Sequence, residues 1–139
     1  MGYIKAIEKN GEDANPFFVM MGIEILSYED GTATLSMKIR PDMLNGSGWL
    51  QGGVYVALAD EAMALALSTT LDEKQEWIAT TTESSNFLRG ANGGTLHVTG
   101  NVVRRGRHTS FCEATVRIDG PAGKICTTTT AAFAVIRRT

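Results

Sequence analysis

Two adjacent acids, Asp60 and Glu61, interrupt the most apolar stretch of the chain, GGVYVALADEAMALAL at residues 52–67. A helix that is apolar on nearly every side belongs in a protein interior. A carboxylate placed there must find partners or stay protonated, because burying an unpaired charge is costly. Either one acid points outward without a role, or a buried acid takes part in chemistry.

Gly52 and Gly53 stand at the predicted start of this helix. The first amides of a helix have no internal acceptor, and together with the helix dipole they can hold an anion or a developing oxyanion. Glycines also let another backbone or a ligand come close. Taken alone, however, the pair fits a sharp corner between loop and helix better than a binding site.

The spacing between the glycines and the acids favours a functional site over a simple corner. Asp60 follows Gly53 by seven residues, nearly two helical turns, so both lie on one face of the helix. Glu61 is rotated by about 100° and shares its face with Val54 and Leu58. At a rise of about 1.5 Å per residue, Gly53 and Asp60 are about 10 Å apart along the axis. That is too far for one reacting carbonyl, so a site that uses both must combine two subunits.

The remaining chain reads as strands. Asn15-Pro16 predicts the start of a short helix that stops at Gly22, and Asp30-Gly31 predicts a hairpin turn. Alternation places Ala33, Leu35, Met37 and Ile39 on one strand face. The expected strands are 23–28, 32–39, 78–88, 96–103, 110–118 and 125–136, and the helix is expected at 52–70. We therefore predict an α+β fold in which an antiparallel sheet of five to six strands wraps one long central helix, with the last four strands as a meander.

Length and composition describe one ordinary domain. The 139 residues are 43% apolar and 20% charged, with a net charge of −2, which gives no basic footprint for nucleic acid. We expect a single domain over residues 1–139, in which 1–15 are poorly structured or form a short helix. The N-terminus lacks a signal-peptide pattern, and the apolar stretch is too short and too acidic to span a membrane, so we predict a cytoplasmic protein. Cys112 and Cys126 are predicted to be buried thiols, and no metal site is expected.

Three motifs carry a resemblance to a known family. The run Asn45-Gly46, Gly52-Gly53 and Leu58-Ala59-Asp60-x-Ala62 resembles the helix entry of hotdog-fold acyl-CoA thioesterases, most of all the phenylacetic-acid-degradation type. Asn86-Phe87-Leu88-Arg89-Gly90 is similar to a strand end usually written Phe-Leu-Arg-Pro, and Arg105-Gly106-Arg107 to a Gly-Arg turn of that family. The order of elements matches from about residue 17 to residue 136.

The resemblance implies hydrolysis of acyl-CoA thioesters by an obligate dimer, often paired again into a tetramer. By this likeness, the Gly53 N–H polarises the thioester carbonyl, and Asp60 of the partner subunit is the nucleophile or the general base for water. Asn45 helps to hold the carbonyl or the water, and Thr80 or Thr81 positions the water. Coenzyme A enters as part of the substrate, and no separate cofactor is implied.

The chain departs from the family at the helix start, where Gln51 replaces the usual histidine before the two glycines. A glutamine amide can donate a hydrogen bond but cannot relay a proton. A non-catalytic protein that binds acyl-CoA esters is therefore the alternative function. A dehydratase or hydratase ranks below both, because no histidine lies near the helix.

Further residues are candidates for binding the coenzyme A ester, because arginine forks match phosphate oxygens and aromatic residues can wall an acyl pocket. They are Gly52, Arg89, Arg105, Arg107, His108 and Trp49. A solvated turn explains the arginines equally well, and a core or dimer contact explains Trp49 equally well.

Overall fold

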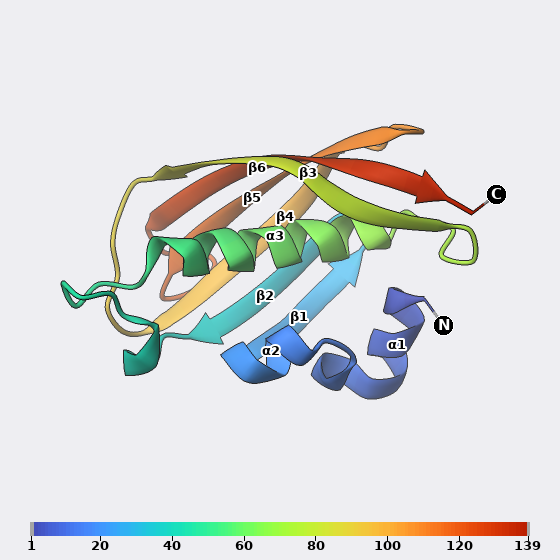
Figure 1. Ribbon diagram of the computed structural model, residues 1–139. Coiled ribbons are helices and arrows are strands. Elements are labelled where there is room, and N and C mark those ends of the chain that lie inside the picture. The colour runs from blue at the N-terminus through green and yellow to red at the C-terminus, as the bar shows by residue number, and fades with distance from the viewer. Residues whose placement is uncertain (1, 139) are drawn as a thin grey trace.

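One long helix, α3 (Gly52–Ser68), runs along the inner face of a six-stranded antiparallel sheet (Figure 1). The computed structural model describes residues 2–138. Its strands are β1 (Ile23–Glu29), β2 (Thr32–Lys38), β3 (Glu76–Phe87), β4 (Thr95–Arg104), β5 (Thr109–Ile118) and β6 (Ile125–Arg137). The predicted α+β architecture, a sheet around one central helix, is confirmed.

The N-terminal elements lie beside the β1 edge of the sheet, below α3 in Figure 1. They are α1 (Tyr3–Asn10), the 3-10 turn η1 (Gly11–Ala14) and α2 (Pro16–Met21). Helix α2 begins where predicted, because the Asn15 side chain accepts hydrogen bonds from the Phe17 and Phe18 amides. It ends at Gly22, which takes the left-handed conformation with φ of 72°.

The first hairpin follows its sequence signals. Asp30 and Gly31 both have positive φ, 47° and 80°, as the tight turn between β1 and β2 requires. Ala33, Leu35 and Met37 of β2 are buried on the inner face, and Ile39 is buried just after the strand. The predicted shared face of these four residues is confirmed.

The predicted four-strand meander is wrong at β3. The strand order is β1-β2-β4-β5-β6-β3, so β3 pairs with β6 and not with β4. Strand β2 already occupies that edge of β4, with Met37 opposite Leu96. After α3 crosses the sheet, β3 pairs along the outer edge of β6, and the chain then returns through residues 88–94 to reach β4.

Strand β3 contains a bulge that the sequence pattern does not announce. Thr80 pairs with Phe133 and Thr82 with Ala132, so Thr81 is an extra residue. After the bulge, Glu83 pairs with Ala131. Phe133 and Ala131 are both buried on the inner face of β6, so Thr80 and Glu83 face α3 together although they are three residues apart.

Helix α3 is buried against the sheet on one side and partly open on the other. Leu58, Ala59, Ala62, Met63 and Leu65 to Leu67 are in the core. Gly100 of β4 permits this close packing, since a Cβ there would lie 2.6 Å from the Ala62 carbonyl carbon. The opposite stripe, formed by Gly53, Val56, Ala57, Asp60 and Ala64, remains partly or fully accessible. The helix is therefore less enclosed within one chain than its composition suggests.

Three further properties of the described residues bear on function. Cys112 and Cys126 are buried and not bonded to each other, as predicted. Within residues 2–138, no helix is long and apolar enough to cross a membrane. In the same range, no three His, Cys, Asp or Glu side chains gather in a way that could hold a metal ion.

Candidate active site

Asp60 meets β3 through Thr80. The Thr80 hydroxyl donates a hydrogen bond of 2.9 Å to Asp60 Oδ1. The hydroxyl of the bulged Thr81 instead donates to the Ala132 carbonyl at 3.0 Å. Of the two threonines that the sequence offered, the structure brings Thr80 to the acid and leaves Thr81 on the sheet backbone.

Glu83 is a second acid beside Asp60, and it is not among the site residues predicted from the sequence. Its Oε1 atom is buried and has no hydrogen-bond partner within residues 2–138. Burial first, and then the contact with the Asp60 carboxylate and its charge, raise the pKa of the Glu83 carboxyl to about 8. Strict alternation from Thr80 would place Glu83 on the outer face of the strand. Only a sequence signal for the bulge could have predicted its inward position, and residues 80–85 (TTTESS) contain no such signal.

Glu61 points to a different part of the molecule. Its Oε2 accepts a hydrogen bond of 3.1 Å from Asn15 Nδ2, which also donates to the Tyr3 hydroxyl at 2.9 Å. Burial raises the pKa of Glu61, and the bond from Asn15 partly opposes that shift. The prediction that the two neighbouring acids serve different faces of the helix is confirmed.

The helix start presents free donors. The Gln51 side chain caps α3 by accepting a bond of 3.1 Å from the Gly52 amide, so its own amide NH2 group is left to donate. The Gly53 N–H has no backbone or side-chain acceptor within residues 2–138. A Cβ on Gly53 would meet nothing within 4 Å in this chain, so internal packing does not require a glycine there.

The loop before α3 is organised by Asn45. Its Oδ1 accepts bonds from the amides of Ser47, at 2.9 Å, and Trp49, at 3.2 Å. Its NH2 group makes no hydrogen bond among the described residues and remains a donor. Trp49 is half exposed, and its ring lies so close to Gly90 that an added Cβ would sit 3.2 Å from it. The loop and the end of β3 therefore meet beside the helix start.

The candidate phosphate-binding residues lie at two ends of the sheet. Arg89 is exposed just after β3, near the helix start, and its amide bonds to the Cys126 carbonyl. Arg107 and His108 are exposed in the β4–β5 turn at the opposite end. Arg105 is already engaged there, because it donates to Glu76 at 2.8 Å and to Thr70 at 3.2 Å.

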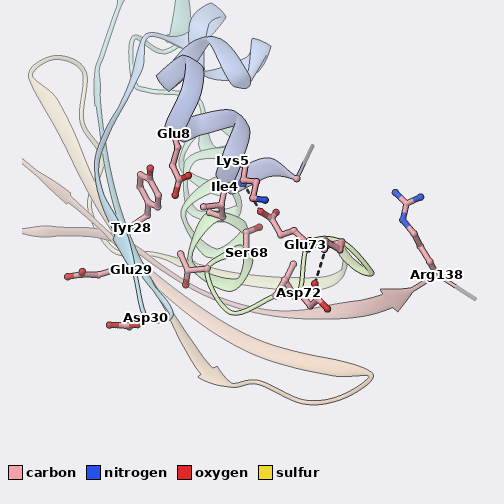
Figure 2. A pocket seen from close by; sticks show the side chains of 14 residues that line it. Ile4, Lys5, Glu8, Tyr28, Glu29, Asp30, Ser68, Asp72, Glu73 and Arg138 are labelled. Atoms are coloured by element: carbon pink, nitrogen blue, oxygen red, sulfur yellow. Dashed lines mark hydrogen bonds between the residues drawn. The ribbon is translucent and has the colours of Figure 1, made fainter.

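One sizeable hollow lies away from Asp60. A hollow of about 740 Å³ opens at the far end of α3, where Figure 2 shows α1, the β1–β2 hairpin and residues 68–74 around it. Its lining mixes acids with lysine, arginine and uncharged residues, and Glu73 there accepts hydrogen bonds from the Tyr3 and Ile4 amides. Gly53, Asp60 and Thr80 do not line it, so its size is no argument that the chemistry occurs there.

The elements of the candidate site are therefore split within one chain. Thr80 and Glu83 from β3 surround Asp60 near the middle of α3. Asn45, Gln51, Gly52 and Gly53 present donors at its first turn, about 10 Å away along the axis.

Comparison with known proteins connects this arrangement to chemistry. The profile of the Thioesterase superfamily matches residues 48–124, more than half of the chain, including Gly53, Asp60 and Thr80. The acyl-coenzyme A thioesterase PaaI of Escherichia coli (strain K12) is 35% identical over 91 residues, which cover 64% of this chain and 61% of that protein. The 1,4-dihydroxy-2-naphthoyl-CoA hydrolase of Listeria monocytogenes is 28% identical over 93 residues, which cover 67% of this chain and 75% of that protein.

A solved structure shows the same fold over the full length. The thioesterase family protein from Silicibacter pomeroyi superposes with a TM-score of 0.86, covering 99% of this chain and 100% of that chain at 23% identity. The motifs, the sheet around α3 and the profile match all agree. The chain belongs to the thioesterase superfamily and has the hotdog fold.

Proposed function

We propose that this protein hydrolyses acyl-CoA thioesters to free CoA and a carboxylic acid. One observation carries the proposal: Asp60, held by Thr80, lies on the accessible stripe of a helix whose Gly53 N–H has no acceptor among residues 2–138. A carboxylate and an unpaired backbone donor are the two groups that attack on a carbonyl requires. The relatives named for acyl-CoA hydrolysis support the choice of substrate.

In the proposed reaction, the Gly53 N–H binds the thioester carbonyl oxygen and stabilises the negative charge that develops on it. The Asn45 and Gln51 amide groups are further donors at the same end of the helix. Asp60 acts as the nucleophile or as the general base that takes a proton from water, and Thr80 fixes its orientation. The carbon–sulfur bond breaks, and one water supplies the hydroxyl of the released acid, either by attacking the thioester directly or by hydrolysing the anhydride formed on Asp60. The proton of that water goes to the CoA sulfur, which leaves as the thiol. No metal or separate cofactor is needed.

The proposed active unit is a homodimer in which Asp60 of one subunit faces Gly53 of the other. Support comes from β3, a twelve-residue strand whose outer edge is unpaired within the chain. Such long free edges are a liability that proteins usually cover. Trp77, Phe87 and Leu88 along it are 44%, 55% and 62% exposed. Pairing β3 with a second copy covers this edge and brings the accessible stripes of two α3 helices together. Assembly of dimers into tetramers stays a prediction from the resemblance.

Arg107, His108 and Arg89 are the proposed contacts for the CoA phosphates, because their side chains are exposed. Arg105 has a structural role instead, since its guanidinium holds Glu76 at the start of β3. The proposed location of the protein is the cytoplasm, where acyl-CoA esters are available to it.

The decisive experiment measures thiol release from a panel of aryl- and alkyl-CoA thioesters by the wild type and by Asp60→Asn. Turnover that disappears in the variant supports the proposal and identifies the preferred acyl class. Tight binding of every ester without turnover by the wild type supports the alternative, an acyl-CoA binding protein, which the replacement of histidine by Gln51 suggests. Because the Gln51 amide remains free to donate, we favour hydrolysis.

The shared site has its own test. Gly53→Pro removes the N–H at a first-turn position where proline is tolerated. We expect Gly53→Pro and Asp60→Asn to be inactive separately. Co-expressed with two different tags, they form heterodimers with one intact site, which restores about a quarter of wild-type activity in a random mixture. No recovery in purified heterodimers would place Gly53 and Asp60 in the same subunit's site.

A further inference from the structure

The Asp60–Glu83 contact brings two acids together without a counter-charge. Among residues 2–138, Asp60 from α3 is the charged group that shifts the pKa of Glu83. From β6, the residues opposite Glu83 and its neighbours are threonine, alanine and phenylalanine. From β5, Cys112 pairs with Ala131, and burial raises the pKa of its thiol to about 12, so it stays neutral. Within residues 2–138, no ion pair joins Glu83 to a cation.

Two adjacent carboxylates without a cation cannot both ionise at low cost, because like charges in a partly buried site repel. One proton between them removes the repulsion and turns one acid into a donor for the other. Asp60 lies on the accessible stripe, whereas Glu83 has a buried oxygen that has no partner within residues 2–138. Since the Thr80 hydroxyl already donates to Asp60 and stabilises its charged form, the Glu83 carboxyl, which lacks such a donor within residues 2–138, is the member that keeps the proton.

We propose that Glu83 is a positioning residue for the thioesterase reaction: in its protonated form it donates a hydrogen bond to the Asp60 carboxylate. Thr80 and Glu83 then hold Asp60 through two donors on the same strand face, and the bulge at Thr81 is what aligns them. The pair carries one negative charge, located on the acid that can reach the substrate. This role rests on the proposed function of Asp60 and adds a pH limit to it.

The pH limit on turnover follows from the protonation of Glu83. When Glu83 loses its proton, it stops donating and places a second negative charge beside Asp60 and the developing oxyanion. Turnover should therefore fall as pH rises above about 8, the pKa of Glu83. Glutamine has the shape of a protonated glutamate, keeps the donor and cannot ionise.

The kinetic test compares pH profiles of kcat for the wild type, Glu83→Gln, Glu83→Ala and Glu113→Gln. Glu113 is an exposed acid on β5 and serves as the matched control. We expect Glu83→Gln to retain most of the activity at pH 7 and to lose the decline above pH 8, while Glu83→Ala loses about tenfold or more in kcat with little change in KM. Glu113→Gln should keep the wild-type profile. An unchanged alkaline decline in Glu83→Gln, or full kcat in Glu83→Ala, would overturn the proposal.

A second measurement does not depend on turnover. In protein labelled with ¹³C at the glutamate carboxyl carbon, the Glu83 signal is assigned by its absence in Glu83→Gln and is followed through a pH titration. We expect it to titrate near pH 8 in the wild type and at lower pH in Asp60→Asn, where the neighbouring charge is gone. Titration of Glu83 between pH 4 and 5 in the wild type would refute the protonated state even if the protein hydrolyses no thioester. If the Glu83 signal titrates near pH 8 but the protein hydrolyses no thioester, the proposed hydrogen bond between Glu83 and Asp60 stands and only the proposed function is rejected.

Discussion

Asp60 and Glu61 are neighbours in sequence, yet they lie in two different environments. Asp60 lies on the accessible stripe of α3, where β3 supplies the Thr80 hydroxyl and the Glu83 carboxyl. Glu61 faces the N-terminal elements, where Asn15 donates to it and the Tyr3 hydroxyl completes the contact. A rotation of about 100° between successive helical residues separates a candidate catalytic acid from a structural one.

The comparison teaches that burial alone does not indicate a role. Burial raises the pKa of both Glu61 and Glu83. The difference lies in what else is present. Beside Asp60 lie the Thr80 hydroxyl and the Glu83 carboxyl, on a strand whose outer edge is free among residues 2–138, whereas beside Glu61 there is Asn15, which also caps α2. One acid has a structural partner, and the other has partners that can serve a reaction.

The largest expected difference is catalytic. Asp60→Asn should lower kcat by about 10³-fold or more, because it removes the group that activates water or attacks the carbonyl. Glu61→Gln should keep kcat within about twofold of the wild type, because its amide still meets Asn15 away from the site. Steady-state thiol release checks both. Equal losses of kcat in the two variants would contradict the assignment of Asp60 to catalysis and Glu61 to structure.

The next contrast concerns the bulge. Thr80→Val should lower kcat about tenfold, because the Asp60 carboxylate loses a hydrogen-bond donor worth about 1.5 kcal/mol or more. Thr81→Val, a change of the same size one residue away, removes only a bond to the Ala132 carbonyl and should leave kcat nearly unchanged. Steady-state kinetics on both variants, with circular dichroism to confirm folding, decides this. A larger loss in Thr81→Val would mean that the bulge is aligned differently.

The Glu61 side should respond in stability rather than in activity. Asn15→Ala removes the cap of α2 and the donor to Glu61, so it should lower the free energy of unfolding by about 1 kcal/mol or somewhat more. Asn10→Ala is the control, since the Asn10 side chain makes no capping bond to η1. Urea unfolding measures both, and kcat of the folded variants should match the wild type. A fall in kcat for Asn15→Ala at full folding would connect the Glu61 side to the site.

The last contrast is the pH dependence of stability. The unfolded chain releases the Glu83 proton near pH 4.5, and the folded chain keeps it to about pH 8. This contribution to the free energy of unfolding is therefore fully present below pH 4.5 and is lost as pH rises to 8. Glu83→Gln should flatten that slope. Glu61→Gln should flatten it in the same direction, since the Glu61 pKa is also raised. A thermal-unfolding series from pH 4.5 to 8.5 measures the slopes, and slopes equal to the wild type in both variants would contradict these assignments.

Much of the fold could be predicted because its signals are local. The hairpin at Asp30-Gly31, the cap at Asn15 and the inward face of β2 each depend on residues within a few positions. The predicted meander was wrong because strand order depends on segments that are distant in the sequence. Which strand edge remains open for β3 depends on β2, more than fifty residues away from β4 in the chain.

Some residues of the candidate site could likewise be predicted from local spacing, and others could not. The helical period alone placed Gly53 with Asp60 and separated Asp60 from Glu61. Choosing Thr80 over Thr81 required the pairing of β3 with β6, because a bulge reverses which residues face inward. Glu83 was missed because the period-two pattern assigns it to the outer face.

The helix, its glycine entry and the acid on the glycine face could be predicted from spacing along one element, and the family resemblance from three short motifs. Which groups meet Asp60 depends on the folded sheet, because those groups come from a strand whose register is fixed by its neighbour. Hydrogen bonds between distant segments set that register, and a single extra residue at Thr81 brings Glu83 to the inner face.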